Sequence, residues 1–197
     1  MTGGLAGVDV RLTGTGSAAV IDVSCGRCAA CTSGSDLWCS RPHSDGEVLV
    51  EVPAAHGETA TQSLLVADAV RCAEPADEHA VLVLGGAAAV AAAALVRLMQ
   101  SGAVLTARDA RDPEVRGALA VARPSGRADV VACVHDDRAA VRAVARGGDV
   151  CIAFGGPATT SVTELVQREV RLLGPRSLTA LLTVLGRPAA EAALAHT

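Results

Sequence analysis

The sequence has no lysine, no asparagine and no tyrosine, and it has one phenylalanine, Phe154, and one tryptophan, Trp38. All 17 basic residues are therefore arginines, and 21 acidic residues outnumber them, giving a net charge of −4. A nucleic-acid-binding surface needs clustered positive charge, and single-strand binding also uses aromatic side chains on which bases stack. The composition therefore argues against nucleic-acid binding.

The sequence also lacks a hydrophobic run long enough for a membrane span. The longest apolar run, residues 81–96, is interrupted by two glycines, is rich in alanine, and ends before Arg97. A transmembrane helix needs about 20 apolar residues. Residues 1–9 contain no basic residue ahead of an apolar stretch, so no signal peptide is predicted. We therefore expect a cytoplasmic protein without a membrane segment, in which the cysteines are thiols or metal ligands rather than disulfides.

Half of the residues are apolar, which is enough for a buried core in a chain of 197 residues. Most of them are alanine, valine and leucine, so a pocket in this core is expected to be lined by aliphatic groups. Up to about residue 80, short apolar segments alternate with turn residues and predict a small all-β lobe. The expected strands are residues 8–12, 19–23, 47–53 and 63–71, with a turn at His56-Gly57-Glu58 before the last of them.

The pattern changes at Val81, where apolar strands begin to alternate with longer helical segments. The expected strands are residues 81–84, 103–106, 129–134, 149–154 and 170–173, and the expected helices are residues 87–101, 113–123, 137–146 and 164–169. This alternation predicts parallel βαβ units in an α/β fold with a Rossmann-like, doubly wound sheet. We therefore expect two domains, a β lobe in residues 1–80 and a Rossmann-like domain in residues 81–197.

Four cysteines lie close together in the sequence, with the spacing C-x2-C-x2-C-x7-C. They are Cys25, Cys28, Cys31 and Cys39. Four thiolates on one glycine-containing loop can close around a tetrahedral Zn²⁺ at about 2.3 Å. Because protein would fill all four positions, such a site is structural and has no open position for a substrate. The alternative is a loop with four unpaired thiols.

The cysteine run from Cys25 to Gly34, completed by Cys39, resembles the structural-zinc lobe of the zinc-containing medium-chain alcohol dehydrogenases and reductases. Residues 57–61 resemble the family's "GGFAEY" turn, and residues 81–86 resemble the first strand of its nucleotide-binding domain. The resemblance covers residues 17–176. It implies that the β lobe is a reduced GroES-like catalytic domain with a structural Zn²⁺. It also implies a homodimer, because residues 170–174 resemble part of the strand through which two such sheets pair.

Two departures from the family affect the expected chemistry. The family holds a catalytic zinc partly by a Cys and a His that precede the lobe, and here no Cys or His precedes Cys25. We therefore expect that the zinc-catalysed mechanism cannot be assembled in its usual way, since a catalytic zinc needs three protein ligands and one open position.

The second departure is an eroded phosphate fingerprint, which makes binding of NAD(P) doubtful. The fingerprint G-x-G-x-x-G becomes Gly85-Gly86-Ala87-Ala88-Ala89-Val90. Ala87 adds a methyl group where the pyrophosphate approaches, and Val90 adds a branched side chain where the helix is expected to pack. Asp109, after the second strand, is the candidate for the ribose, while the neighbouring Arg108 points to NADP.

Other polar residues are weaker candidates for catalysis. His43 and Asp45 on one side of an expected hairpin, and His56 and Glu58 on the other, could work as general acids and bases. The alternative is a solvated polar loop. His135 follows the third strand of the expected parallel sheet, where α/β proteins build sites, although the neighbouring aspartates could simply cap the next helix.

These features leave three hypotheses for the function. The leading one is a non-redox enzyme on a degenerate dehydrogenase scaffold, a cyclase or isomerase acting on a small apolar intermediate such as a polyketide in bacterial specialised metabolism. The second is an NAD(P)-dependent oxidoreductase without catalytic zinc. The third is a non-enzymatic, zinc-stabilised scaffold protein.

Overall fold

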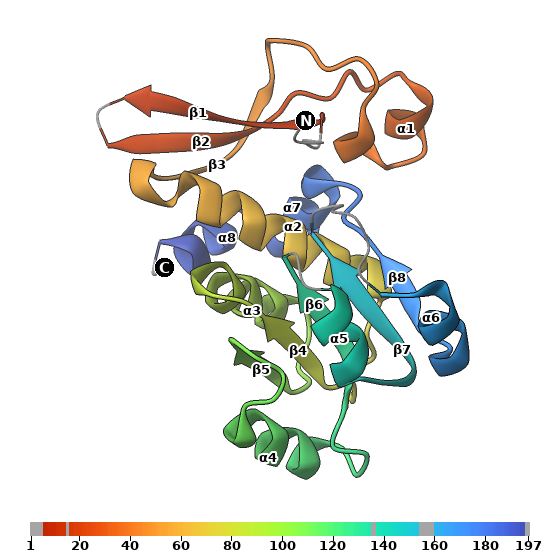
Figure 1. Ribbon diagram of the computed structural model, residues 1–197. Coiled ribbons are helices and arrows are strands. Elements are labelled where there is room, and N and C mark those ends of the chain that lie inside the picture. The colour runs from red at the N-terminus through yellow and green to blue at the C-terminus, as the bar shows by residue number, and fades with distance from the viewer. Residues whose placement is uncertain (1–5, 15, 135–136, 154–159, 196–197) are drawn as a thin grey trace.

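The computed structural model describes residues 6–14, 16–134, 137–153 and 160–195 and contains two sheets (Figure 1). The antiparallel sheet has the order β1 (Val8–Gly14), β2 (Ser17–Asp22) and β3 (Glu47–Pro53). The second sheet has the order β5 (Val104–Ala107), β4 (Val81–Leu84), β6 (Ala128–Cys133), β7 (Val144–Ile152) and β8 (Arg171–Leu173). All of its strand pairs are parallel. The expected α/β fold with a parallel sheet and a small β lobe is confirmed.

Helices cover both faces of the parallel sheet. The helices are α1 (Ala29–Thr32), α2 (Gly57–Ala73), α3 (Ala87–Met99), α4 (Pro113–Ala122), α5 (Asp137–Ala143), α6 (Val162–Arg168), α7 (Leu178–Leu185) and α8 (Arg187–Leu194). Along β4, Val81 and Val83 pack in one cluster with α2, α3, α7 and α8. Leu82 and Leu84 pack in the other cluster, with α4 and α5. Since successive side chains of a strand point to opposite faces, this split shows a doubly wound sheet.

The predicted strand at residues 63–71, and the turn before it, are wrong. Residues 57–73 form α2, a 17-residue helix, and His56 ends a short 3-10 helix, Ala54–His56, directly before it. The helix lies between the antiparallel sheet and α3 (Figure 1), so twelve of its residues are buried. A helix buried on most sides has no polar face, and its sequence therefore lacks the 3.6-residue alternation that normally identifies a surface helix.

The part of the chain before residue 80 is therefore not an all-β lobe. Residues 57–73 precede the expected domain boundary, but they pack against β6, β7 and α3 of the parallel-sheet unit. One helix thus serves both sheets. The division into residues 1–80 and 81–197 stays a prediction.

Two helices at the end of the described chain, α7 and α8, were not anticipated from the sequence. Helix α8 covers the outer edge of β3 with polar side chains. Arg187 donates to the carbonyl of Val48 at 3.1 Å, and the Glu51 amide donates to Glu191 at 3.1 Å. These contacts satisfy backbone groups that an edge strand otherwise leaves open to pairing. Within the described ranges, no helix is long and apolar enough to cross a membrane.

Candidate functional site

The four cysteines of the C-x2-C-x2-C-x7-C segment converge in the structure. Their sulfur atoms all lie within 4.8 Å of one another. The Sγ atoms of Cys28 and Cys31 are 3.4 Å apart, those of Cys28 and Cys39 are 3.9 Å apart, and those of Cys25 and Cys31 are 4.0 Å apart. Four sulfurs around a tetrahedral Zn²⁺ at about 2.3 Å are about 3.8 Å apart. The cluster therefore matches the size of a four-cysteine zinc site.

Backbone amides around the cluster favour the thiolate forms that bind zinc. The amide of Cys28 donates to the sulfur of Cys25, and the amides of Cys25 and Arg41 donate to the sulfur of Cys39, each at 3.3 Å. Backbone hydrogen bonds lower the pKa of Cys28 to about 5, and they also lower the pKa of Cys25, whereas burial and the neighbouring thiols raise the pKa of Cys31 to about 12. Such amides orient the ligands and stabilise their charge, as the outer partners of metal sites commonly do. The cluster can thus hold a metal ion.

The loop that carries these cysteines is fastened to the far end of the chain. Residues 35–38 lie against residues 175–177, the segment between β8 and α7. Four hydrogen bonds join the segments: Leu37 N to Arg176 O at 3.2 Å, Trp38 Nε1 to Pro175 O at 3.0 Å, Arg176 Nε to Ser35 Oγ at 3.1 Å, and Ser177 Oγ to Asp36 Oδ2 at 2.7 Å. Trp38 therefore anchors the loop to this segment.

Two carboxylates complete this junction. Asp68 of α2 is fully buried and accepts hydrogen bonds from the amides of Arg176 and Ser177, at 2.6 and 2.9 Å, and from Arg71 Nε at 2.7 Å. Burial raises the pKa of the Asp36 carboxyl, and the hydroxyl of Ser177 partly offsets this effect. The cysteine loop, the α7 segment and α2 thus form one hydrogen-bonded unit. Its polar groups support structure rather than a substrate.

The carboxyl edge of the parallel sheet is built differently. Between β4 and α3 the chain turns at Gly85 and Gly86. Gly85 has φ +142, a backbone conformation that residues other than glycine rarely adopt. Gly86 and Ala87 are exposed, and a Cβ built on Gly86 meets nothing within 4 Å. The start of α3, at Gly86 and Ala87, is therefore open to solvent, and free amides of a helix N-terminus can bind an anion there.

Val90 lies on the exposed side of this helix. Its side chain is 56% exposed, while the packing face of α3 is formed by its neighbours, including Ala89 and Ala92. Ser63 of α2 donates to the carbonyl of Ala88 at 3.0 Å and fixes the start of α3 against α2. Val90 is therefore no obstacle to helix packing, contrary to the expectation from the fingerprint.

A pocket of about 280 Å³, here called the edge pocket, opens beside this turn. It is lined by the ends of β4 and β6, by Gly85 and Val134 directly after them, and by residues 108–111 after β5. In open α/β sheets, ligands bind outside the carboxyl ends of the strands where the strand order reverses. The order β5-β4-β6 places that reversal at β4. The edge pocket therefore occupies the position expected for a ligand.

The edge pocket shares residues 109–111 and Ala139 with a larger hollow between α4 and α5, here called the arginine hollow. The hollow measures about 520 Å³. Five arginines line it: Arg111, Arg116, Arg127, Arg138 and Arg142. The gathering of five of the 17 arginines in an otherwise acidic chain makes this hollow locally positive. These arginines could not be grouped from the sequence because they come from separate elements. The sequence feature that could have located them is the pair Arg108 and Arg111 after β5, together with further arginines on the facing helices α4 and α5.

Asp109, the expected ribose ligand, is engaged within its own loop. Its Oδ1 accepts the amide of Arg111 at 2.9 Å and lies 3.8 Å from Arg111 Nε. Arg108 is exposed, and among the described residues no carboxylate is paired with it. The free charge beside the edge pocket is therefore positive.

The expected histidine–carboxylate group is not assembled. His43 and Asp45 precede β3, and His56 and Glu58 follow it. A seven-residue strand separates its two ends by about 23 Å. The expected hairpin is absent because its second strand is part of α2. His43 and Asp45 are exposed, Glu58 accepts from the neighbouring Gln62 at 3.3 Å, and His56 Nδ1 is buried and has no partner in the described structure. His135 lies outside the described residues.

Comparisons with known proteins bear on the fold. No protein-family model matches the sequence, and a comparison with curated proteins gives no match. Solved structures do match. They include an acetophenone reductase from Geotrichum candidum in complex with NAD, with 17% identity and TM-score 0.57, covering 88% of this chain and 64% of that chain.

Two further structures give similar values. A thermostable alcohol dehydrogenase from Pyrobaculum aerophilum with bound cobalt and zinc has 18% identity and TM-score 0.54, covering 85% of this chain and 63% of that one. A zinc-binding dehydrogenase from Sinorhizobium meliloti bound to NADP has 20% identity and TM-score 0.56, covering 89% and 66%. The chain therefore spans less than two thirds of the length of these structures. Over that length, with its four-cysteine loop, it has the fold of the zinc-containing medium-chain alcohol dehydrogenases.

Proposed function

We propose that this chain binds NADP(H) at the carboxyl edge of its parallel sheet and works as an NADP-dependent oxidoreductase without a catalytic zinc. The observation that carries the proposal is the exposed Gly85–Gly86 turn beside a pocket lined by Arg108 and Arg111. Bound NADP(H) supplies hydride chemistry. The residues of this chain hold and orient it.

The turn fits a pyrophosphate in spite of the lost fingerprint glycines. Gly86 keeps open space above its Cα, and the exposed Ala87 begins a 13-residue helix whose first amides point out of the turn. The helix dipole adds partial positive charge at the same place. The methyl group of Ala87 reduces the space through which a pyrophosphate reaches the turn, but it does not fill that space.

The charges beside the pocket favour a ligand with an additional phosphate. An acidic residue at the end of the second strand binds the ribose hydroxyls of NAD, whereas an arginine there accommodates the 2′-phosphate of NADP. Here Asp109 is bound to Arg111, and Arg108 remains free at the rim. The arginine hollow next to it adds further positive charge. We therefore infer a preference for NADP over NAD.

The cysteine cluster itself differs from a catalytic zinc site. In the described residues, the four cysteines are the one group of three or more side chains placed to hold a metal. Four protein ligands leave no open position on such a metal. The cluster thus fits a structural ion.

A cyclase or isomerase acting on a small apolar intermediate is the alternative function. That reaction needs mainly a preorganised apolar cavity. The edge pocket and the arginine hollow, however, carry charged side chains, including Arg108 and Arg116. The described pockets at this edge therefore favour a phosphorylated ligand over an apolar one.

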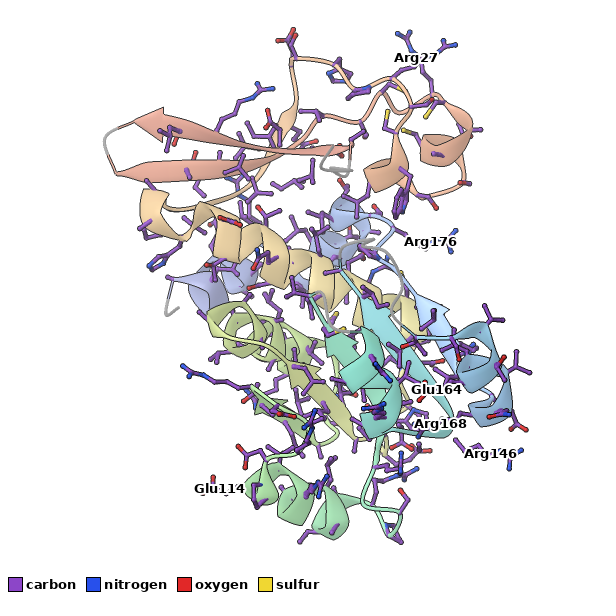
Figure 2. The ribbon with its side chains drawn as sticks, in the orientation of Figure 1. Arg27, Glu114, Arg146, Glu164, Arg168 and Arg176 are labelled. Atoms are coloured by element: carbon purple, nitrogen blue, oxygen red, sulfur yellow. The ribbon has the colours of Figure 1, made fainter. Side chains whose placement is uncertain are left out.

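Titration with NADPH and NADH, followed by fluorescence enhancement or calorimetry, tests the proposal. We expect micromolar binding of NADPH and weaker binding of NADH. Arg108→Ala should weaken NADPH at least tenfold, which corresponds to about 1.4 kcal/mol, and affect NADH less. Arg27→Ala is the matched control, because Arg27 lies on the cysteine loop, away from the parallel sheet (Figure 2). No binding of either nucleotide up to millimolar concentration would contradict the proposal and favour the cyclase.

We also propose that the protein resides in the reducing cytoplasm. There it forms a homodimer in which the outer edges of two β8 strands pair. Strand β8 ends the parallel sheet, and Leu172 on it is 40% exposed. An open edge strand is a template for pairing with a second chain. Sedimentation of the wild type against Leu172→Lys tests this, with a dimer converting to a monomer as the expected result. A wild-type monomer contradicts it.

A further inference from the structure

A pocket with a buried amide lies at the opposite edge of the parallel sheet from the edge pocket. It measures about 170 Å³ and is lined by the ends of α2 and α3 and by Val184 of α7. We call it the Gln100 pocket, because Gln100 lines it directly after the last residue of α3. Helix α3 leads from the carboxyl edge to the amino edge, and its 13 residues are about 20 Å long. The two pockets are therefore separate sites.

The amide of Gln100 has no hydrogen-bond partner in the described structure. The residue is 8% exposed, and both Oε1 and Nε2 are buried and unpaired. A buried amide normally makes its hydrogen bonds, because leaving it unpaired costs about 1–3 kcal/mol. An unpaired amide beside a pocket therefore indicates that the missing partner comes from the pocket.

The remaining walls of the pocket are mainly apolar. Val70, Val96 and Met99 form the inner wall, and Val184, which is 62% exposed, stands at the mouth. Arg71, also at the rim, is held by the buried Asp68 at 2.7 Å and so cannot swing in to pair with Gln100 without leaving that carboxylate. The pocket thus presents one donor–acceptor pair on an aliphatic surface.

Size and hydrogen bonding together define the ligand. A cavity of about 150 Å³ with apolar walls holds one benzene ring, so this pocket holds one six-membered ring. The side-chain amide offers an N–H next to a C=O, and a ring with a cis N–H and C=O pairs with both at once. The terminal bond of a glutamine side chain is soft, so the amide can turn toward the pocket.

We propose that the Gln100 pocket binds a compact ring of the lactam or pyrimidinone class, which forms two hydrogen bonds with the Gln100 amide. The ring fills the space between Val96, Met99 and Val184. The ligand carries no net charge, because the buried inner wall is aliphatic, Arg71 is paired with Asp68, and the carboxylate of Glu74 belongs to an exposed residue of the lining. This proposal does not depend on the cofactor site.

The methyl group of Met99 reports binding directly. The chain has two methionines, Met1 and Met99, so a protein labelled with ¹³C in the methionine methyl groups gives two resonances. We expect that δ-valerolactam, added to the full chain, shifts the Met99 resonance with a millimolar or tighter Kd and leaves Met1 unchanged. Cyclohexanone has the same ring size but no N–H, and it should bind at least tenfold more weakly.

Variants separate this site from nonspecific binding. Gln100→Leu keeps the size of the side chain and removes the amide, so it should fold and lose lactam binding at least tenfold. Gln167→Leu, on the exposed face of α6, is the matched control and should bind like the wild type. Saturating NADPH should leave lactam binding unchanged. The proposal is overturned if the Met99 signal does not move, or if Gln100→Leu binds the lactam as well as the wild type.

Discussion

The cysteine loop and the carboxyl edge of the parallel sheet differ in what their polar groups contact. In the loop, nearly every polar group has an internal partner: Ser35, Asp36 and Trp38 all bind residues 175–177. At the carboxyl edge, Gly86, Ala87 and Arg108 face solvent. The loop thus makes most of its hydrogen bonds within the protein, with Asp36 Oδ1 as a buried exception, and the edge keeps free donors and positive charge.

Whether a polar group already has a partner inside the protein distinguishes structural from functional residues here more reliably than the residue type does. Cysteine, aspartate and tryptophan are common at active sites, yet here they fasten one segment to another. The edge has no residue of obvious catalytic type, but its exposed amides and guanidinium groups are the groups that can still bind a ligand. Available hydrogen-bonding capacity, rather than residue identity, locates the candidate site.

Removal of a cysteine ligand should have the largest effect. Cys28→Ser is expected to eliminate bound zinc, to release the loop from residues 175–177, and to lower Tm by about 10 °C, since metal binding is part of the folding free energy of such sites. Zinc analysis and calorimetry measure both. Cys72→Ser, outside the cluster, is the control and should change stability by less than about 1 kcal/mol. Equal zinc content and Tm in the wild type and Cys28→Ser would contradict a structural role of the cysteine loop.

The buried carboxylate of Asp68 tests the junction behind the loop. Asp68→Asn leaves a poorer acceptor facing two backbone amides and Arg71, so we expect a loss of about 3 kcal/mol in the free energy of unfolding. Urea denaturation measures it. The exposed Asp77 supplies the control, and Asp77→Asn should lie within about 0.5 kcal/mol of the wild type. A neutral Asp68→Asn would show that the junction contributes little.

Neighbouring residues of the turn after β4 distinguish fold from binding at the carboxyl edge. Gly85→Ala places a side chain at φ +142 and should cost about 1–3 kcal/mol of stability. Ala87→Leu enlarges an exposed side chain and should leave stability within about 0.5 kcal/mol. It should nevertheless weaken NADPH roughly tenfold, about 1.4 kcal/mol, because Ala87 occupies the position that the pyrophosphate approaches. If Ala87→Leu binds NADPH normally, the pyrophosphate does not lie on this turn.

A surface ion pair outside both regions shows how much a variant without a structural or binding role changes the stability. Arg146 binds Glu169 at 2.7 Å and lowers the pKa of that carboxyl. A lowered pKa in the folded state contributes stability above the unfolded pKa, and this contribution is lost as the pH falls through the folded value. Arg146→Gln should return the pKa of Glu169 to its ordinary range in an NMR titration. Because both side chains are exposed, Tm at neutral pH should change by less than about 1 °C. A larger change in Tm would mean that small stability changes in the other variants cannot be assigned to the cysteine loop or to the carboxyl edge.

The sequence predicted what depends on local spacing. The four cysteines lie within 15 residues, so their pattern alone located the cluster, and the strand–helix alternation after Val81 located the parallel sheet. Helix α2 was missed because it is buried between two layers and shows no polar face. Asp68 and the segment 175–177 could not be paired in advance, since about 110 residues separate them along the chain. The arginine hollow was missed because its arginines belong to separate helices and loops that come together only in the folded chain.

The junction between the cysteine loop and residues 175–177 also orders events during synthesis. The hydrogen bond between Asp36 and Ser177 joins positions 141 residues apart. At about 5–20 residues per second, a ribosome needs roughly 7–28 s to add that length. The four cysteines emerge early and can capture a metal within their own short loop. The captured loop then waits, with Leu37 and Trp38 undocked, until the segment before α7 is made. A chaperone that covers apolar loops on nascent chains therefore has a defined interval in which to act on this protein.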